Sequence, residues 1–449
     1  MKDSRLKIQD SSNMIHDLQL ATCNLQPSLD IVCSANLYWD ETRWQRPNHI
    51  MSRLSKYCRI LYVRPLDFRF YLRDRKRWGK SKRDFKVNQN LTIFFPIVFP
   101  FAERLKFISF LNKILMIIRI KMKIWSLGFK NIILWFYTPK SIYLMGRLNE
   151  KFIVYDIMDE HSKFNGAPKG IDETERRLIE KCNIVFTGTN RLWDEKREFN
   201  SNSHFFSCGV DYSHFAKAQD KNVIARSEIP RLSLRDSQSE PKQSQDRLGT
   251  GSAISKKGIA SPSARNDRKI AFPDEMADIP SPVVGYVGAV DDRLDYDLIR
   301  KMAESHPEWS IVLIGPFVGV KQDDLPDMKN IFYLGGRRYN ELPSYIKNFS
   351  VCIMPFKKNP LTDKINPTKA LEYMAAGKPI VSTPIPDMEE FYSHIIKIGH
   401  DADLFIKHVE REIKSPDLKG ISEGINLSRE RTWEKVAESM YGIIQPSLH

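Results

Sequence analysis

Cysteine pairs, metal-ligand clusters and long apolar runs are all missing from this sequence of 449 residues. Its six cysteines are scattered, and none forms a C-x-x-C pair or stands with histidines at metal-ligand spacing. We therefore expect no structural metal and no disulfide framework, and a reducing cytoplasm is the simplest setting. Residues 1–30 lack the apolar core of a secretory signal, and no run of 18 apolar residues occurs, so we expect no membrane span.

The composition is that of a globular protein with a basic balance. Hydrophobic residues make up 42% and aromatic residues 11%, which is enough for one or two full cores and excludes a wholly disordered chain. The formal net charge is +14, which favours anionic partners such as a phosphorylated substrate, an anionic membrane face or nucleic acid. We expect no nucleic acid partner, because the basic residues form no recognised binding module.

Short apolar runs, rich in β-branched and aromatic residues, alternate with helix-length segments in both halves of the chain. In the first half these strand candidates are 31–34, 60–63, 91–98, 132–136, 152–155, 184–187 and 204–207. In the second half they are 283–287, 310–314, 331–334, 351–355, 379–382 and 395–398, with helices expected over 295–305 and 341–348. This alternation predicts an α/β protein with two doubly wound, Rossmann-like domains of parallel strands that face each other across a cleft.

The expected domain boundaries follow from these patterns. We predict an N-terminal tail over 1–27, a first domain over 28–218, a linker over 219–280, a second domain over 281–424 and a C-terminal segment over 425–449, helical over 428–444. Within the linker, residues 225–269 hold nine serines, ten basic residues and no aromatic residue. Such a stretch cannot bury enough apolar surface to fold, so it is predicted to be a disordered insert.

The most informative motif is N-P-T-K-A-L-E-Y-M-A-A-G-K-P-I-V-S-T, residues 366–383. Pro367 can open a helix and Gly377 can end it, before a short buried strand. The free N–H groups at such a helix start attract an anion, and Lys369 in the first turn adds a positive charge. Glu372 follows three residues later and could accept two hydrogen bonds from a ribose, so together these are the parts of a nucleotide diphosphate site. The alternative for Lys369 and Glu372 is an ordinary surface ion pair.

This motif resembles the nucleotide-sugar signature P-x-K-x-x-E-Y-x-A-x-G-K-P of the GT-B glycosyltransferases of group 1, family-4-like. The resemblance is closest to the bacterial polysaccharide-assembly subset that includes the teichuronic-acid transferases. Further segments resemble the same family in the same order, from about residue 30 to 440. They are W-Q-R-P (44–47), Y-D-x-x-D (155–159), G-V-D-x-x-x-F (209–215), V-G-Y-V-G-A (284–289), L-G-G-R-R-Y-N-E-L-P (334–343) and I-M-P-F (353–356).

The resemblance implies a GT-B fold, a nucleotide-diphosphate sugar as donor substrate, and no cofactor or metal. It also implies that the last helix crosses back to the first domain. The donor-binding residues carried over from the motifs are Gly285, Gly288, Arg337, Tyr339, Pro367, Thr368, Lys369 and Glu372. For the two glycines, relief of crowding at a strand end is the alternative. A D-x-D pattern at 295–297 is discounted as a metal site because it begins a predicted helix.

On the acceptor side we expect Asp40, Trp44, Arg46 and His161, of which Trp44 and Arg46 belong to the W-Q-R-P motif. The alternative for His161 is an ordinary polar residue at a helix start. Asp159 is the expected general base, because it follows a buried strand at its carboxyl end, where a cleft should open; capping the next helix is its alternative role. Asp156 and Asp40 are the reserves for this role, and Lys369 is expected to stabilise the departing diphosphate.

Two positions depart from the family pattern. Lys364 stands where the family usually carries a second acid, eight residues before the ribose-binding glutamate, although Asp363 is adjacent. The stereochemical course, inverting or retaining, therefore stays open. The usual glycine-rich turn after the first strand is replaced by S-A-N-L-Y-W-D at 34–40.

Residues 101–130 hold seven basic residues against one acid, interleaved with apolar side chains. This pattern favours a helix at a membrane surface, and the alternative is a core helix with solvated lysines. Sequence alone thus predicts a glycosyltransferase at the cytoplasmic face of the membrane, which moves a sugar to a glycan or lipid-linked acceptor in cell-surface polysaccharide assembly. A nucleotide-sugar epimerase on the same fold and a non-catalytic nucleotide-sugar or polyanion-binding protein are the alternatives.

Overall fold

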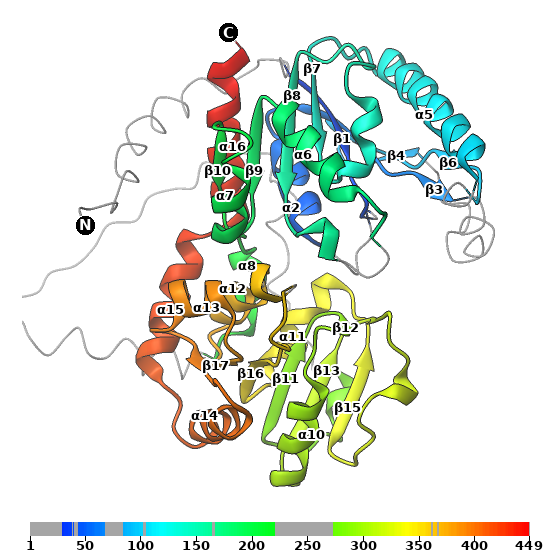
Figure 1. Ribbon diagram of the computed structural model, residues 1–449. Coiled ribbons are helices and arrows are strands. Elements are labelled where there is room, and N and C mark those ends of the chain that lie inside the picture. The colour runs from blue at the N-terminus through cyan, green and yellow to red at the C-terminus, as the bar shows by residue number, and fades with distance from the viewer. Residues whose placement is uncertain are drawn as a thin grey trace, which may run out of the picture. The chain divides into compact units, whose positions relative to one another are not determined.

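The fold is that of a computed structural model, in which the chain forms two compact units (Figure 1). Unit 1 takes in the described residues up to Cys208, then Lys364 and Ile365, and the stretch from Trp433 onward. Unit 2 takes in the described residues from Gly209 to Thr432 other than these two. The structure describes residues 29–37, 39, 44–67, 84–101, 105–163, 167–220, 273–360, 362–365 and 368–448. The predicted tail over 1–27, the predicted insert over 225–269, Asp40 and Pro367 lie outside the described residues.

Unit 1 is built on an eight-stranded sheet in the order β10-β9-β8-β7-β1-β2-β5-β4. The strands are β1 (Asp30–Ser34), β2 (Arg59–Val63), β4 (Asp84–Lys86), β5 (Leu91–Phe94), β7 (Ile132–Phe136), β8 (Phe152–Ile157), β9 (Ile184–Thr187) and β10 (Ser203–Phe205). All neighbours are parallel except β4, which pairs antiparallel with β5 at the edge. Strand β1 pairs with both β2 and β7, so the order of the sheet reverses there, and ligands bind beyond the carboxyl ends of strands at such a point.

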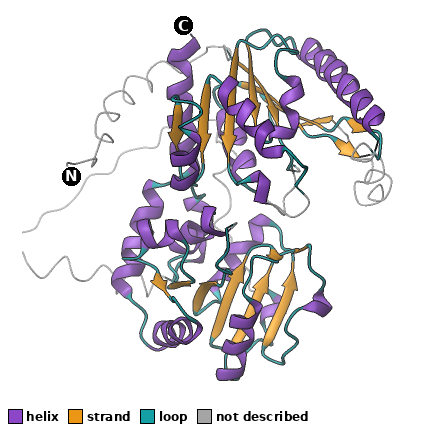
Figure 2. Ribbon diagram, in the orientation of Figure 1, coloured by secondary structure: helices purple, strands orange, loops and turns teal. Residues whose placement is uncertain are grey.

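Helices cover both faces of this sheet (Figure 2). Alternate residues of the strands belong to two separate hydrophobic clusters, as the period of two in a strand requires. One cluster includes α2 (Arg46–Leu54) and α16 (Trp433–Ile444), and the other includes α5 (Lys106–Leu127), α6 (Ile171–Lys181) and α7 (Asn190–Lys196). Burial on both faces explains why the strands are apolar almost throughout.

The predicted strand over 91–98 is two strands in the structure. Strand β5 ends at Phe94, and Ile97–Val98 forms β6, which pairs with β3 (Leu66–Asp67) in a separate small sheet. Pro96 lies between them. Because proline has no N–H to donate to a neighbouring strand, the ladder breaks at this residue.

The helix predicted over 428–444 is also two helices, because the chain breaks between α15 (Leu418–Glu430) and α16. At the break the Arg431 carbonyl accepts a hydrogen bond of 2.9 Å from the Val210 N–H, and Thr432 pairs with Val210 in an isolated bridge. These contacts replace the helical hydrogen bonds at that point. Helix α16 then packs against α2, where the Trp433 ring stacks on His49 with centroids 4.7 Å apart.

Unit 2 contains a six-stranded parallel sheet in the order β15-β13-β11-β16-β17-β18. Its strands are β11 (Val283–Val287), β13 (Ser310–Ile314), β15 (Ile331–Gly335), β16 (Val351–Met354), β17 (Ile380–Ser382) and β18 (Lys397–Ile398). Its helices include α8 (Tyr212–Phe215), α10 (Tyr296–Ser305), α11 (Leu342–Lys347), α12 (Thr368–Ala375), α13 (Pro386–Tyr392), α14 (Ala402–Lys414) and α15. The order reverses between β11 and β16, as in other doubly wound sheets.

Two glycines allow the loops after β11 and β13 to approach closely. A Cβ atom on Gly315 would lie 1.6 Å from the carbonyl oxygen of Gly288. No side chain can occupy that position unless the backbone moves, so glycine is required at the carboxyl end of β13. The approach holds the two loops together at the edge where a ligand of such a sheet binds.

Candidate functional site

Helix α12 carries three of the predicted donor residues, Thr368, Lys369 and Glu372. Thr368 is its first residue and Lys369 its second. The Lys369 ammonium lies 2.8 Å from the carboxylate of Glu372, which is one turn further along the helix. The helix ends at Gly377, whose φ of +68° is a conformation that favours glycine. The hydroxyl of Tyr373 accepts a hydrogen bond of 2.7 Å from the Val287 N–H, so α12 is held against the carboxyl end of β11.

Glu372 is a buried carboxylate, and among the described residues Lys369 is its one cationic partner. Its side chain is 5% exposed, whereas that of Lys369 is 21% exposed. Burial raises the pKa of Glu372, Lys369 opposes that shift, and the charge of Asp211 adds to it. Since a buried charge needs compensation, Glu372 is a group whose hydrogen-bonding capacity exceeds what one lysine supplies.

Asp211 and His214 come to this region from the turn that closes the first half of the sequence. His214 stacks on Tyr339, with ring centroids 4.7 Å apart and planes at 13°, and its Nε2–H donates to the Tyr339 carbonyl at 2.9 Å. Burial lowers the pKa of His214. The sequence predicts Tyr339 as a donor residue but does not show that His214 is its neighbour, because 125 residues separate the two in the chain.

Two arginines of unit 2, the predicted donor residue Arg337 and Arg293, each form an ion pair with a carboxylate. The Arg337 guanidinium lies 3.0 Å from Glu275 and donates to the Tyr345 hydroxyl at 2.8 Å. Arg293 holds Asp291 at 2.6 Å. A diphosphate would have to draw these guanidinium groups from their partners, whereas the N–H groups at the start of α12 need no such exchange.

The two donor-side glycines differ in their surroundings. A Cβ on Gly285, in the middle of β11, would lie 2.1 Å from the ring of Phe349, so close packing alone requires a glycine there. Gly288 follows the strand, where a Cβ would lie 2.3 Å from the Tyr286 hydroxyl. Relief of crowding therefore accounts for Gly285, and the role of Gly288 in approaching a phosphate stays a prediction.

In unit 1 Arg46 and Asp156 form a buried ion pair. Arg46 begins α2, and its Nε lies 2.9 and 3.1 Å from the two oxygens of Asp156, at the end of β8. Its Nη1 donates to the Phe206 carbonyl at 2.7 Å. Burial lowers the pKa of Arg46, but the neighbouring carboxylate outweighs this and raises it above its ordinary value. Burial raises the pKa of Asp156, and the charge and hydrogen bonds of Arg46 oppose that shift. Both side chains are at most 2% exposed, so this geometry favours a positioning role for Asp156 over proton transfer.

Asp159 and His161 lie three and five residues further along, after the carboxyl end of β8, and both are half-buried. Between them Glu160 is buried in a network of charges. The Lys196 ammonium lies 3.3 Å from Glu160 and 2.9 Å from Glu175. The catalytic role of Asp159 and the acceptor role of His161 stay predictions.

Lys364, which replaces a family acid, belongs to the same network. Its ammonium lies 3.0 Å from Glu160 and 2.7 Å from Glu195. Burial would raise the pKa of Glu160, but Lys196 and Lys364 outweigh burial and lower it. The sequence analysis missed Glu160 as a partner for Lys364, because 204 residues separate the two in the chain.

Aromatic rings surround the start of α2. The ring of Trp44 lies 5.7 Å from that of Trp39 and 5.2 Å from that of His49, in edge-to-face arrangements. Trp39 also lies 5.1 Å from Tyr62, which belongs to β2. Trp44 is thus held beside the carboxyl ends of the central strands, where the prediction placed an acceptor.

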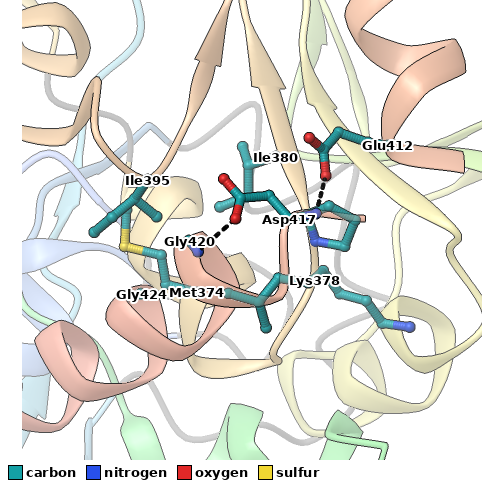
Figure 3. A pocket seen from close by; sticks show the side chains of 10 residues that line it. Met374, Lys378, Ile380, Ile395, Glu412, Asp417, Gly420 and Gly424 are labelled. Carbon is teal, nitrogen blue, oxygen red and sulfur yellow. Dashed lines mark hydrogen bonds between the residues drawn. The ribbon is translucent and has the colours of Figure 1, made fainter. Parts of the chain in front are cut away.

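A small pocket in unit 2 lies away from these residues (Figure 3). It is lined by Met374, Ile380, Ile395, Gly420 and Gly424 and by three charged residues, Lys378, Glu412 and Asp417. Met374 follows Glu372 by two positions, so the two side chains leave α12 about 200° apart. The pocket has room for about one water molecule, so we do not assign it a substrate.

The described residues contain no group of three or more histidine, cysteine, aspartate or glutamate side chains that could hold a metal ion. In the D-x-D pattern, Asp295 caps α10 by accepting a hydrogen bond of 3.0 Å from the Leu298 N–H. Asp297 pairs with Arg300 on the same helix at 2.9 Å. The two carboxylates thus act as a helix cap and as an exposed ion pair.

Part of the second half of the chain matches a known protein family. Residues 281–414 match the family model described as glycosyl transferases group 1. Over 107 residues the chain is 32% identical to the Bacillus subtilis (strain 168) protein TuaH, which is named as a teichuronic acid biosynthesis glycosyltransferase. That match covers 23% of this chain and 27% of TuaH, so it spans about a quarter of that relative.

Solved structures match over nearly the whole chain. Sucrose-phosphate synthase from Thermosynechococcus elongatus matches with a TM-score of 0.62 at 12% identity, over 93% of this chain and 98% of the synthase. Anabaena HepE, in complex with UDP and glucose, matches with a TM-score of 0.58 at 11% identity, over 92% of this chain and 99% of HepE. At such identities the likeness shows the fold, and the predicted fold class, GT-B with two Rossmann-like sheets, is confirmed.

Proposed function

We propose that this chain, whose residues 281–414 match the family described as glycosyl transferases group 1, transfers a sugar from a nucleotide-diphosphate donor to an acceptor hydroxyl. The observation that carries the proposal is the pair of Lys369 and Glu372 on the first turns of α12. A buried carboxylate beside a lysine, at a helix start next to the end of β11, supplies groups for a ribose and for a diphosphate together.

Each donor-side group has a distinct task in this proposal. The N–H groups at the start of α12 and the Lys369 ammonium stabilise the diphosphate, most strongly when it leaves with its full negative charge. Glu372 accepts hydrogen bonds from the ribose hydroxyls, which replace part of the contact that Lys369 makes now. Lys369 then turns toward the phosphates, which its partial exposure permits.

The transfer breaks the bond between the anomeric carbon and the diphosphate oxygen and forms a bond from the acceptor oxygen to the same carbon. The acceptor proton must leave during this exchange. We assign it to the Asp159 carboxylate if the configuration inverts, since Asp159 follows the carboxyl end of β8. With retention, an oxygen of the departing diphosphate takes the proton, and Asp159→Asn then changes kcat little.

The acceptor class and the donor base follow from relatives and are part of the proposal. TuaH supports an acceptor in cell-surface polysaccharide assembly, a glycan or a lipid-linked glycan. HepE, which has been solved with UDP and glucose, makes UDP the first nucleotide to test. Trp44 with Trp39 provides aromatic faces of the kind that pack on a sugar ring.

Calorimetric titration of the full chain with UDP, GDP, ADP and TDP tests the donor site. We expect micromolar binding of one of them by the wild type and a loss of about 10- to 100-fold in Glu372→Gln, because hydrogen bonds to a charged group contribute about 1.5–3 kcal/mol. Glu412→Gln is the matched control, since Glu412 is also a buried glutamate of unit 2 with a raised pKa. Equal weakening in both variants would contradict a ribose contact at Glu372.

Turnover is tested separately from binding. With the matching nucleotide sugar, we expect release of nucleoside diphosphate only when an acceptor glycan is present. Conversion of the sugar without an acceptor would instead identify an epimerase, and tight binding without turnover on any acceptor would identify a binding protein. The anomeric configuration of the product, read by proton NMR, decides between the two fates of the acceptor proton.

A further inference from the structure

Helix α5 exposes an unusual amount of apolar surface. Of the twelve large apolar side chains that the described part of the chain leaves exposed, nine lie between Phe99 and Trp125. Six of these lie on α5 itself and are exposed as follows: Phe107 75%, Phe110 60%, Ile114 38%, Ile118 48%, Met122 64% and Trp125 86%. A continuous exposed patch of this kind marks an interaction site.

The six side chains form one stripe along the helix. At about 100° per residue, they fall within about 60° of a single direction. The buried side chains Met116, Ile120 and Ile124 lie on the opposite side and belong to the core of unit 1. Figure 1 shows α5 (cyan) on the periphery of that unit. The helix therefore does two things at once, since one side holds it to the protein and the other presents apolar surface.

The charge on α5 has one sign. Its 22 residues include five basic residues and no acidic one. Arg119 and Lys123 are held within unit 1, by the Ile97 carbonyl and by Asp84. Lys106, Lys113 and Lys121 are exposed, and no described carboxylate lies within ion-pair distance of them.

We propose that the stripe, defined as Phe107, Phe110, Ile114, Ile118, Met122 and Trp125, docks on the surface of an anionic lipid bilayer. Apolar and aromatic side chains would enter the boundary between headgroups and acyl chains, and the exposed lysines would contact anionic headgroups. No helix among the described residues is long and apolar enough to cross a membrane. Docked in this way, α5 would lie in the plane of the interface.

Charge decides between a bilayer and a second copy of this chain. Two stripes packed on each other would bring lysines of both copies together with no acidic residue of α5 to compensate them. An anionic bilayer compensates the same lysines, and each adds about 1 kcal/mol, or about fivefold in affinity. This inference does not rest on sugar transfer, so its test and the nucleotide titrations fail or succeed independently.

Co-sedimentation of the full chain with vesicles tests the proposal. We expect binding to vesicles of phosphatidylcholine with about one third phosphatidylglycerol, at least about tenfold tighter than to phosphatidylcholine alone, and weakened by raised salt. The double variant Phe107→Ser with Trp125→Ser should lose at least about tenfold in affinity. The matched control is Val87→Ser with Val318→Ser, which removes two exposed apolar side chains elsewhere and should bind like the wild type.

The charge contribution has its own variants. Lys106→Gln with Lys121→Gln should weaken binding to the anionic vesicles about twentyfold or more, and Lys169→Gln with Lys181→Gln, exposed lysines outside α5, should not. All these positions are exposed, so the variants should keep the thermal stability of the wild type.

Several outcomes would overturn the proposal. They are no binding by the wild type, equal binding to both kinds of vesicle, and an equal loss in the control variants. Light scattering of the protein without vesicles could also contradict the proposal. If the wild type is a dimer and the Phe107→Ser, Trp125→Ser variant is a monomer, the stripe is a self-association face.

Discussion

The ion pair of Arg46 and Asp156 gives the sharpest prediction for the stability of unit 1. Asp156→Asn keeps the shape of the side chain but removes its charge. The Arg46 guanidinium, of which 2% of the side chain is exposed, then keeps its charge with no carboxylate to compensate it. Removing one partner of a buried pair costs about 3–5 kcal/mol, a large part of the total stability of an ordinary domain. For a unit of this size we expect the melting temperature to fall by about 6–20 °C.

Urea unfolding of the full chain, followed by tryptophan fluorescence and circular dichroism, measures this cost. Glu180→Gln is the matched control, because Glu180 also accepts from an arginine at 2.9 Å, Arg176, but both side chains of that pair are about half exposed. An exposed pair contributes at most about 1 kcal/mol, so the control should unfold almost like the wild type.

A double variant separates the ion pair from the space that it fills. Arg46→Met with Asp156→Leu replaces both charges with apolar groups, and we expect it to be more stable than Asp156→Asn. If Asp156→Asn unfolds like the Glu180→Gln control but loses turnover, the positioning role is wrong and Asp156 acts in the chemistry. If the double variant is as unstable as the sum of both single variants, the two residues do not act as a pair.

Three further predictions concern other parts of the fold. Gly315→Ala should destabilise unit 2 by at least about 3 kcal/mol in urea unfolding, because its Cβ would lie 1.6 Å from the Gly288 carbonyl oxygen. The control Gly442→Ala in α16, whose Cβ would have nothing within 4 Å, should stabilise the protein by about 0.5–1 kcal/mol. Similar effects of both variants would contradict the close approach at Gly315. Burial raises the pKa of Glu412 from its ordinary 4.5, so the native state holds its proton more tightly than the unfolded state, and stability should fall as the pH rises from about 4.5 through the raised pKa. Glu412→Gln should lack this decline, and parallel stability curves for both proteins would refute it. Trp433→Ala should cost about 3–5 kcal/mol and expose α16 to proteolysis, since the ring is 2% exposed, and unchanged protease resistance would show that α16 is held by other contacts.

Much of the fold follows from local sequence. The runs of β-branched and aromatic residues over 132–136, 283–287 and 310–314 became strands with the same bounds, because a strand buried on both faces needs apolar side chains throughout. Helix α12 with its stop at Gly377 followed from residues within one short motif. Local signals can also be overlooked. The predicted strand over 91–98 contains Pro96, a residue that interrupts a strand, and the structure has two strands there.

The partners of the charged residues followed only from the tertiary structure. Asp156 was a reserve for catalysis in the sequence, and folding pairs it with Arg46, 110 residues away. Glu372 lies in the electrostatic field of Asp211, which is even further away in the chain, and Lys364 pairs with Glu160 across 204 residues. The order of strands decides which loops share one edge of a sheet, and neither composition nor periodicity encodes that order residue by residue.

Helix α5 shows the same division most clearly. Its sequence is apolar on nearly every side and basic throughout, which favoured a membrane-surface helix and left a core helix as the alternative. Only the folded unit shows that Met116, Ile120 and Ile124 are buried while Phe107 and Trp125 are exposed. A hydrophobic side chain carries no mark of which neighbour will cover it, and burial is a property of the packed layers around it.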